Sequence, residues 1–147
     1  MIEITRLVLD VGLLVLIWMI QLIVYPSFLF YTVKELIAWH KMYTKAIALI
    51  VIPLMLGQLG ITIYQVFLEQ NTYTSTSILL VVFIWGITLL KFAPMHQQIS
   101  EGNTHEQLLK KLVQINWIRT IIWTILCAMS AALSLIHISE PTRREGI

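Results

Sequence analysis

Arg119 points most clearly to a site, because it lies inside an apolar stretch with no carboxylate at a comparable depth. Asn116 and Thr120 accompany it at a spacing that a helix places on one face. We expect Arg119 to be satisfied by Glu35 folded inward, by buried amides and carbonyls, by a lipid phosphate or by a bound ligand. Two structural alternatives stay open: Arg119 extends toward the headgroups, or these polar groups only hold helices together.

Polar side chains form stripes on three apolar segments. At about 100° per residue, the members of each stripe share one helical face. Polar groups in membrane proteins usually face the interior, so we expect the stripes to meet inside a bundle. The stripes are Asp10, Gln21 and Tyr25; Gln58, Thr62 and Gln65; and Asn116, Arg119, Thr120, Trp123, Cys127 and Ser130. With a rise of about 1.5 Å per residue, Asp10 and Arg119 are offset by roughly 15 Å, which is too far for an ion pair.

Histidines near the ends of the apolar segments add acid–base groups. His40 and His96 are predicted on the same side of the membrane, with His105 nearby, and each can act as an acid, a base or a ligand. Their spacing matches no metal motif, so we predict no metal and no cofactor, with haem on His40 and His96 as the alternative. The predicted catalytic residues are Arg119, Asn116 and His96, and the predicted ligand-binding residues are Gln21, Tyr25, Thr120 and Trp123.

The composition places these residues in a membrane. Of 147 residues, 58% are hydrophobic and 12% are charged, against about 25% charged in soluble domains. The formal charge of +2 leaves no basic stripe for nucleic acid. A bilayer core needs about 20 apolar residues in a helix. We predict an all-α membrane protein with four antiparallel transmembrane helices, at about residues 7–30, 43–67, 78–95 and 112–132.

Basic residues predict the orientation of this bundle. The loops 31–42 and 96–111 and their borders hold most of the lysines, whereas residues 68–77 hold none. By the positive-inside rule, both basic loops are cytoplasmic and both termini are outside, in a bacterial inner membrane. The expected partners are the bilayer, a hydrophobic small molecule and further copies of the chain. The single cysteine, Cys127, excludes an internal disulfide.

Short motifs predict where helices begin and bend. Thr32 with Glu35, and Thr104 with Gln107, fit the pattern of a capping box. The first box predicts a short interfacial helix that leads into the second span. The prolines Pro26, Pro53 and Pro94 are expected to kink or end their helices.

Residues 133–147 resemble the translation of a transposon end and sequencing adapter. We therefore expect the native chain to be a single membrane domain of residues 1–132. This interpretation also removes His137 from the candidate ligands.

The order of these motifs resembles one family of small membrane proteins. Pro26 closes the first span, Pro53 lies within the second, residues 92–96 read Phe-Ala-Pro-Met-His, and residues 115–120 read Ile-Asn-Trp-Ile-Arg-Thr. The sequence resembles the anthrone oxygenase-like family over nearly all of residues 1–132. The resemblance implies a four-helix membrane bundle and cofactor-free oxygenation of a phenol-like aromatic substrate.

Three functions are consistent with the sequence. The first is a small membrane protein without catalysis, which needs only the four spans. The second is an oxygenase in which Arg119 and Asn116 bind a phenolate or enolate oxygen and His96 is the base. The third is a transporter or proton-coupled carrier that uses Asp10 and Arg119.

Overall fold

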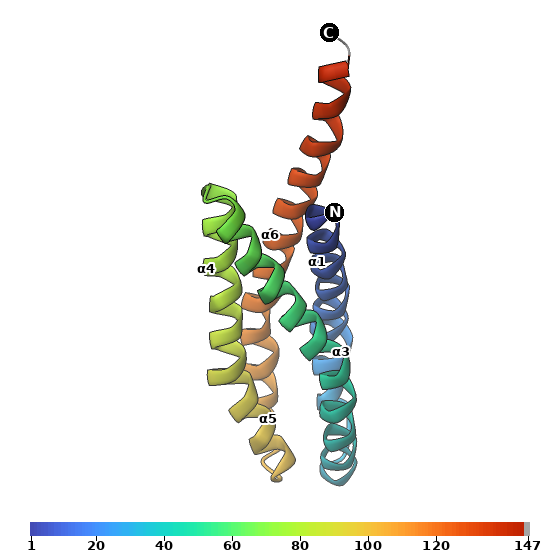
Figure 1. Ribbon diagram of the computed structural model, residues 1–147. Coiled ribbons are helices and arrows are strands. Elements are labelled where there is room, and N and C mark those ends of the chain that lie inside the picture. The colour runs from blue at the N-terminus through green and yellow to red at the C-terminus, as the bar shows by residue number, and fades with distance from the viewer. Residues whose placement is uncertain (146–147) are drawn as a thin grey trace.

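The computed structural model describes residues 1–145, with side chains described through Ser139. The described chain forms four long helical rods (Figure 1). The first contains α1 (Ile2–Met19), η1 (Ile20–Val24), α2 (Tyr25–Ser27) and η2 (Phe28–Phe30); the second is α3 (Val33–Leu68); the third contains α4 (Thr72–Ile87), η3 (Thr88–Phe92) and α5 (Ala93–Ser100); the fourth is α6 (Glu106–Glu145).

These rods confirm the predicted all-α bundle. Each is long and apolar enough to cross a membrane. The first rod packs on α3 and α6, and the α4–α5 rod also packs on α3 and α6. The short connections make these neighbours antiparallel (Figure 1). Large apolar side chains cover the outer surface, as expected for contact with lipid; Leu49, Phe67 and Leu90 are at least 75% exposed.

Two of the four rods begin at a capping box. In the predicted box, Thr32 Oγ1 accepts a hydrogen bond from the Glu35 amide, and Glu35 accepts one from the Thr32 amide. The predicted interfacial helix is wrong as a separate element, because α3 runs unbroken from this cap to Leu68. A second box, missed in the sequence, joins Asn71 and Thr74 at the start of α4.

The predicted box at Thr104 and Gln107 is wrong. Helix α6 begins at Glu106, and the His105 carbonyl accepts hydrogen bonds from the amides of Leu108 and Leu109. The preceding turn contains Gly102 at φ 104°, a backbone conformation that favours glycine. A capping box at Thr104 would begin the helix at His105, whereas after this turn α6 begins one residue later, at Glu106.

Two prolines follow wide turns of π-helix. Pro26 comes after η1, and Pro94 comes after η3. A proline ring clashes with the carbonyl four residues before it, so a π turn at that point lets the rod continue. Pro53 lies inside the unbroken α3, which changes direction near its middle (Figure 1). The prolines therefore bend rods or change their hydrogen bonding, and none of these three ends a rod.

The last turns of α6 extend beyond the other rods (Figure 1). They include part of residues 133–147, whose adapter origin stays a prediction, and Gly146 and Ile147 lie outside the described residues.

Candidate functional site: an arginine in an intramembrane pocket

Arg119 lies inside the bundle. It is 5% exposed, and its guanidinium carbon is 4.4 Å from the ring centre of Phe92 and 5.1 Å from that of Trp123. Such distances favour cation–π attraction. Arg119 therefore does not extend toward the headgroups. Glu35 is not its counter-ion, because that exposed carboxylate bonds Thr32.

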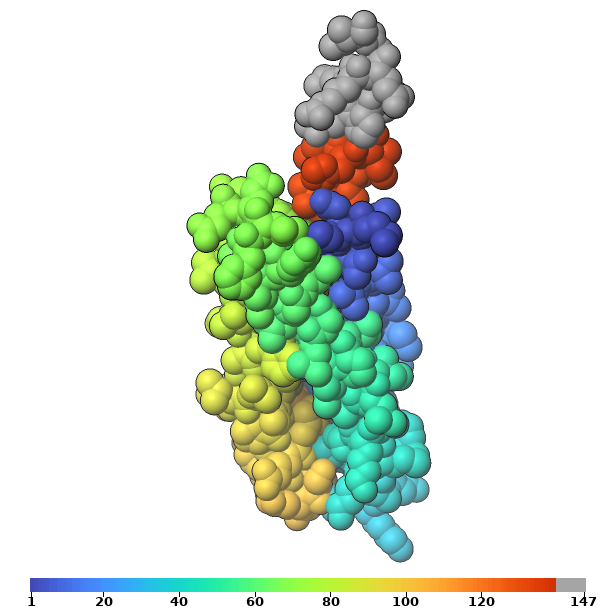
Figure 2. Space-filling model, in the orientation of Figure 1, coloured from blue at the N-terminus to red at the C-terminus, as the bar shows by residue number. Residues whose placement is uncertain are grey.

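Arg119 faces a largely apolar pocket of about 330 Å³. This volume lies near the lower end of the range for small-molecule sites. The pocket lies between α3 and the α4–α5 rod, and Figure 2 shows a hollow there. Ile52 and Leu89 line it and are about half exposed, so the opening is at the side of the bundle, within the spans. The polar side chains that line it are Tyr25, Tyr43, Thr44, Trp85, Thr88, His96 and Arg119.

Three polar atoms of pocket-lining residues are buried without a hydrogen-bond partner among the residues that the structure describes. They are Nε of Arg119, Nε1 of Trp85 and Oγ1 of Thr88. A buried polar group without a partner costs about 1–3 kcal/mol. Two of these atoms are donors, and the hydroxyl can donate as well. The apolar walls suit a mostly apolar molecule. Neighbouring atoms shield the three polar atoms, so an acceptor oxygen in the pocket reaches them only after a side chain moves.

A chain of hydrogen bonds leads away from this pocket. Tyr25 Oη lies 2.9 Å from His96 Nε2, His96 Nδ1 lies 2.8 Å from His40 Nε2, and His40 Nδ1 lies 2.9 Å from Ser100 Oγ. His40 is fully buried, and the two imidazole rings stack with centres 5.0 Å apart. Because their facing nitrogens bond each other, haem ligation would require both rings to turn.

Three predicted site residues form a separate polar cluster beside the pocket. Asn116 Nδ2 and Thr120 Oγ1 donate to Gln21 Oε1 at 2.9 and 3.0 Å, and Gln21 Nε2 donates to the Val113 carbonyl at 3.1 Å. These bonds fix η1 against α6. The structure thus brings Arg119, His96 and Tyr25 to the pocket, whereas Asn116 and Thr120 bond Gln21 outside the pocket lining.

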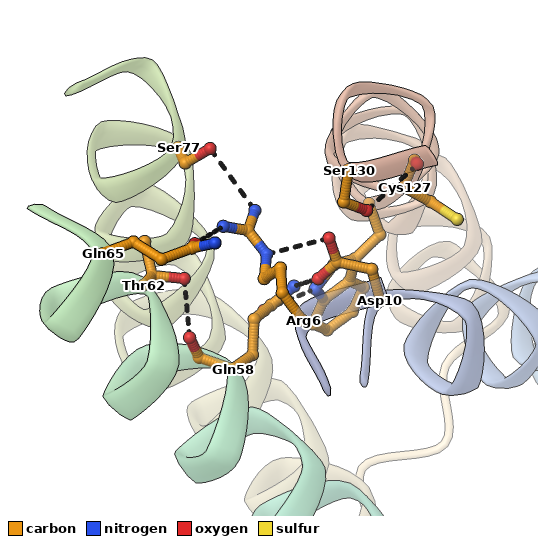
Figure 3. Close-up of polar contacts among 9 residues, drawn as sticks. Arg6, Asp10, Gln58, Thr62, Gln65, Ser77, Cys127 and Ser130 are labelled. Carbon is orange, nitrogen blue, oxygen red and sulfur yellow. Dashed lines mark hydrogen bonds and ion pairs between the residues drawn. The ribbon is translucent and has the colours of Figure 1, made fainter. Parts of the chain in front are cut away.

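A third polar cluster occupies the other half of the bundle (Figure 3). Arg6 Nε donates to Asp10 at 2.9 Å, and its other nitrogens donate to Gln65 at 2.9 Å and Ser77 at 3.4 Å. Gln58 Nε2 donates to Asp10 at 2.7 Å. Arg6 and Asp10 are both fully buried. Asp10 therefore pairs with Arg6 and not with Arg119, in agreement with the predicted offset.

Trp123 joins the Arg119 region to this third cluster. Its Nε1 donates to Gln58 Oε1 at 3.1 Å, and its ring lies beside the Arg119 guanidinium. The three polar stripes therefore converge as predicted. The burial of Arg6 was not predicted from the sequence. Its spacing of four residues from Asp10 could have indicated an ion pair on one helical face.

We expect Trp123→Phe to lower the free energy of unfolding by about 1–3 kcal/mol, because Gln58 Oε1 would lose its buried donor. Denaturant unfolding in detergent, followed by circular dichroism, measures this change. Trp39→Phe is the matched control, since Trp39 is 36% exposed. Equal stability of the two variants would contradict a contribution of this hydrogen bond.

Comparison with known proteins returned no matching family model, curated protein or solved structure.

Proposed function

We propose that this membrane protein is a cofactor-independent oxygenase that takes an anthrone- or phenol-like molecule from the bilayer into the pocket around Arg119. The observation that carries the proposal is the set of unpartnered atoms in an otherwise apolar pocket: Arg119 Nε, Trp85 Nε1 and Thr88 Oγ1. A flat aromatic molecule would pack against the apolar walls, and after a side-chain movement its oxygen would accept from Arg119 Nε and from Trp85 or Thr88. The opening at the side of the bundle gives such a molecule access from lipid.

The proposed role of Arg119 is to stabilise the anion that forms when the substrate loses a proton. A fixed cation in a site without bulk water favours ionisation much more than the same group does in water. Tyr25 and His96 line the same pocket and bond each other. The hydroxyl of Tyr25 passes its proton to His96 and takes the substrate's proton in its place.

The chemistry balances with dioxygen as the second substrate. Removal of a proton from the reactive CH₂ group of an anthrone leaves a carbanion that is delocalised onto the ring oxygen. Addition of O₂ and return of the proton give a hydroperoxide at that carbon. Loss of water then converts the carbon into a ketone, so CH₂ and O₂ become C=O and H₂O. The substrate supplies the electrons, which is why no further reductant is needed.

Oxygen consumption tests this proposal. Purified protein in lipid nanodiscs is mixed with anthrone, and dioxygen uptake is compared with formation of the quinone. We expect equal molar amounts of each and a rate that is proportional to protein. His96→Gln should lower the rate by about a hundredfold or more, because the base is lost. A wild-type rate no higher than that of empty nanodiscs would contradict the proposal.

The carrier hypothesis has less support. It uses Asp10 as a free acidic group, but Asp10 is fully buried and bonds Arg6 and Gln58. We therefore place the function in the pocket around Arg119.

A further inference from the structure

We infer that His96, His40 and Ser100 form a reversible proton relay between the pocket and the end of the bundle where α5 ends. This inference rests on the proposed function, because it supplies the route for the substrate's proton. The members come from three rods: Tyr25 from the first, His40 from α3, and His96 and Ser100 from α5. All three distances between them, 2.9, 2.8 and 2.9 Å, are short enough for hydrogen bonds.

The relay has a pocket end and a surface end. Tyr25 and His96 line the pocket, whereas Ser100 is the last residue of α5 and is partly exposed. The exposed residues Glu101 and Gly102 follow it. His40, between the two ends, is fully buried under the ring of Phe28, whose centre is 5.6 Å away. A proton can therefore travel from the pocket to water without crossing an apolar layer.

The hydrogen bonds permit two orderings of the protons. A neutral histidine has one N–H donor and one acceptor nitrogen. In the first ordering, Tyr25 donates to His96 Nε2, His96 Nδ1 donates to His40 Nε2, and His40 Nδ1 donates to Ser100. In the second, every donation is reversed. Both histidines therefore always have the same tautomer, and a shift from the first ordering to the second releases a proton at Ser100 and leaves the Tyr25 oxygen able to accept one.

The proposed reaction needs a relay that works in both directions. It removes a proton from the substrate at the start and returns one when the hydroperoxide forms and loses water, so no proton is released overall. The first shift takes up the proton, and the reverse shift returns it. Neither ring has to turn over between the two steps. His40 is thus a positioning residue that acts through His96.

Anaerobic binding of anthrone tests the relay, because without dioxygen the reaction stops after ionisation. Protein with ¹⁵N-labelled histidine is titrated with anthrone in nanodiscs, and a pH-sensitive dye records released protons. We expect the anthrone anion to form with release of about one proton per anion, and His40 and His96 to change from Nδ1–H to Nε2–H together.

His40→Gln is the critical variant, because glutamine retains a hydrogen-bonding group facing His96 but cannot pass a proton on. We expect it to bind anthrone and to form about tenfold less anion. Ser100→Ala removes the hydroxyl at the surface end of the relay without changing either imidazole ring. We expect it to release fewer protons than wild type, as His40→Gln does. His105→Gln, in the exposed loop, should behave like wild type.

The outcomes separate the relay from the proposed function. If wild type ionises anthrone and both His40→Gln and Ser100→Ala release protons equally well, the relay is wrong while the proposed function stands. If wild type does not ionise anthrone, the proposed function fails, and the spectrum without ligand decides the relay. Equal tautomers of His40 and His96 would support it, whereas opposite tautomers or a doubly protonated ring would overturn it.

Discussion

Arg119→Ala should lower the rate of anthrone oxidation by about a hundredfold to a thousandfold, the range observed when one donor to a developing oxyanion is removed. The alanine leaves the apolar walls of the pocket in place but removes the only arginine or lysine that lines it among the described side chains. The anion of the substrate then has no cation to stabilise it. Dioxygen uptake at saturating anthrone measures the effect on kcat, and its dependence on anthrone measures the effect on KM.

Two further variants make this prediction specific. Arg119→Lys keeps the positive charge but lacks the buried Nε donor, which has no partner among the described residues. We expect it to recover only part of the lost rate. Lys91→Ala changes an exposed basic residue in η3, outside the pocket lining, and should leave the rate unchanged. A full rate in Arg119→Ala would show that the arginine has a structural role only.

The second large effect concerns stability and the buried pair of Arg6 and Asp10. Asp10→Leu should lower the free energy of unfolding by about 3–5 kcal/mol, because it leaves a buried guanidinium without its anion. Both partners are fully buried and their nearest charged atoms are 2.9 Å apart. Thermal or denaturant unfolding in detergent, followed by circular dichroism, measures the change.

The double variant Arg6→Met with Asp10→Leu is the matched control for this pair. It removes both charges and fills the space with apolar atoms, and such replacements are often neutral or stabilising. We expect it to be clearly more stable than Asp10→Leu alone. If Asp10→Leu unfolds like wild type, the ion pair does not contribute to the stability of the folded protein in detergent.

The features predicted well from the sequence depend on local pattern. Hydropathy and length predicted the four spans, and the spacing of Gln58, Thr62 and Gln65 predicted a buried face. The cap at Thr32 followed from the residues within one helical turn. Each of these is determined by neighbours along the chain, which is what a single sequence records.

The features that were missed depend on contacts between distant residues. His40 and His96 are 56 positions apart and bond each other. No local sequence pattern indicates that these two residues are in contact. Asn116 was expected to face a ligand, yet it donates to Gln21, because η1 turns that amide toward α6. A π turn has no reliable sequence signature. The directions of Gln21 and Tyr25 were therefore predicted from regular α-helical spacing, which η1 does not follow.

Arg6 shows a different limit. Counting basic residues for topology treats each one as a solvated charge, and Arg6 lies near the beginning of the chain. Its burial depends on acceptors from two other rods, Gln65 on α3 and Ser77 on α4. Only the folded bundle brings these acceptors within reach.

The most direct test of the central claim is an experimental structure of the protein in lipid with anthrone bound under anaerobic conditions. We predict that the ligand lies in the pocket between α3 and the α4–α5 rod. Its oxygen should be about 2.7–3.2 Å from Nε of Arg119, with a further bond from Trp85 or Thr88. A ligand bound elsewhere, or a pocket that stays unchanged at saturating anthrone, would contradict the assignment of this site.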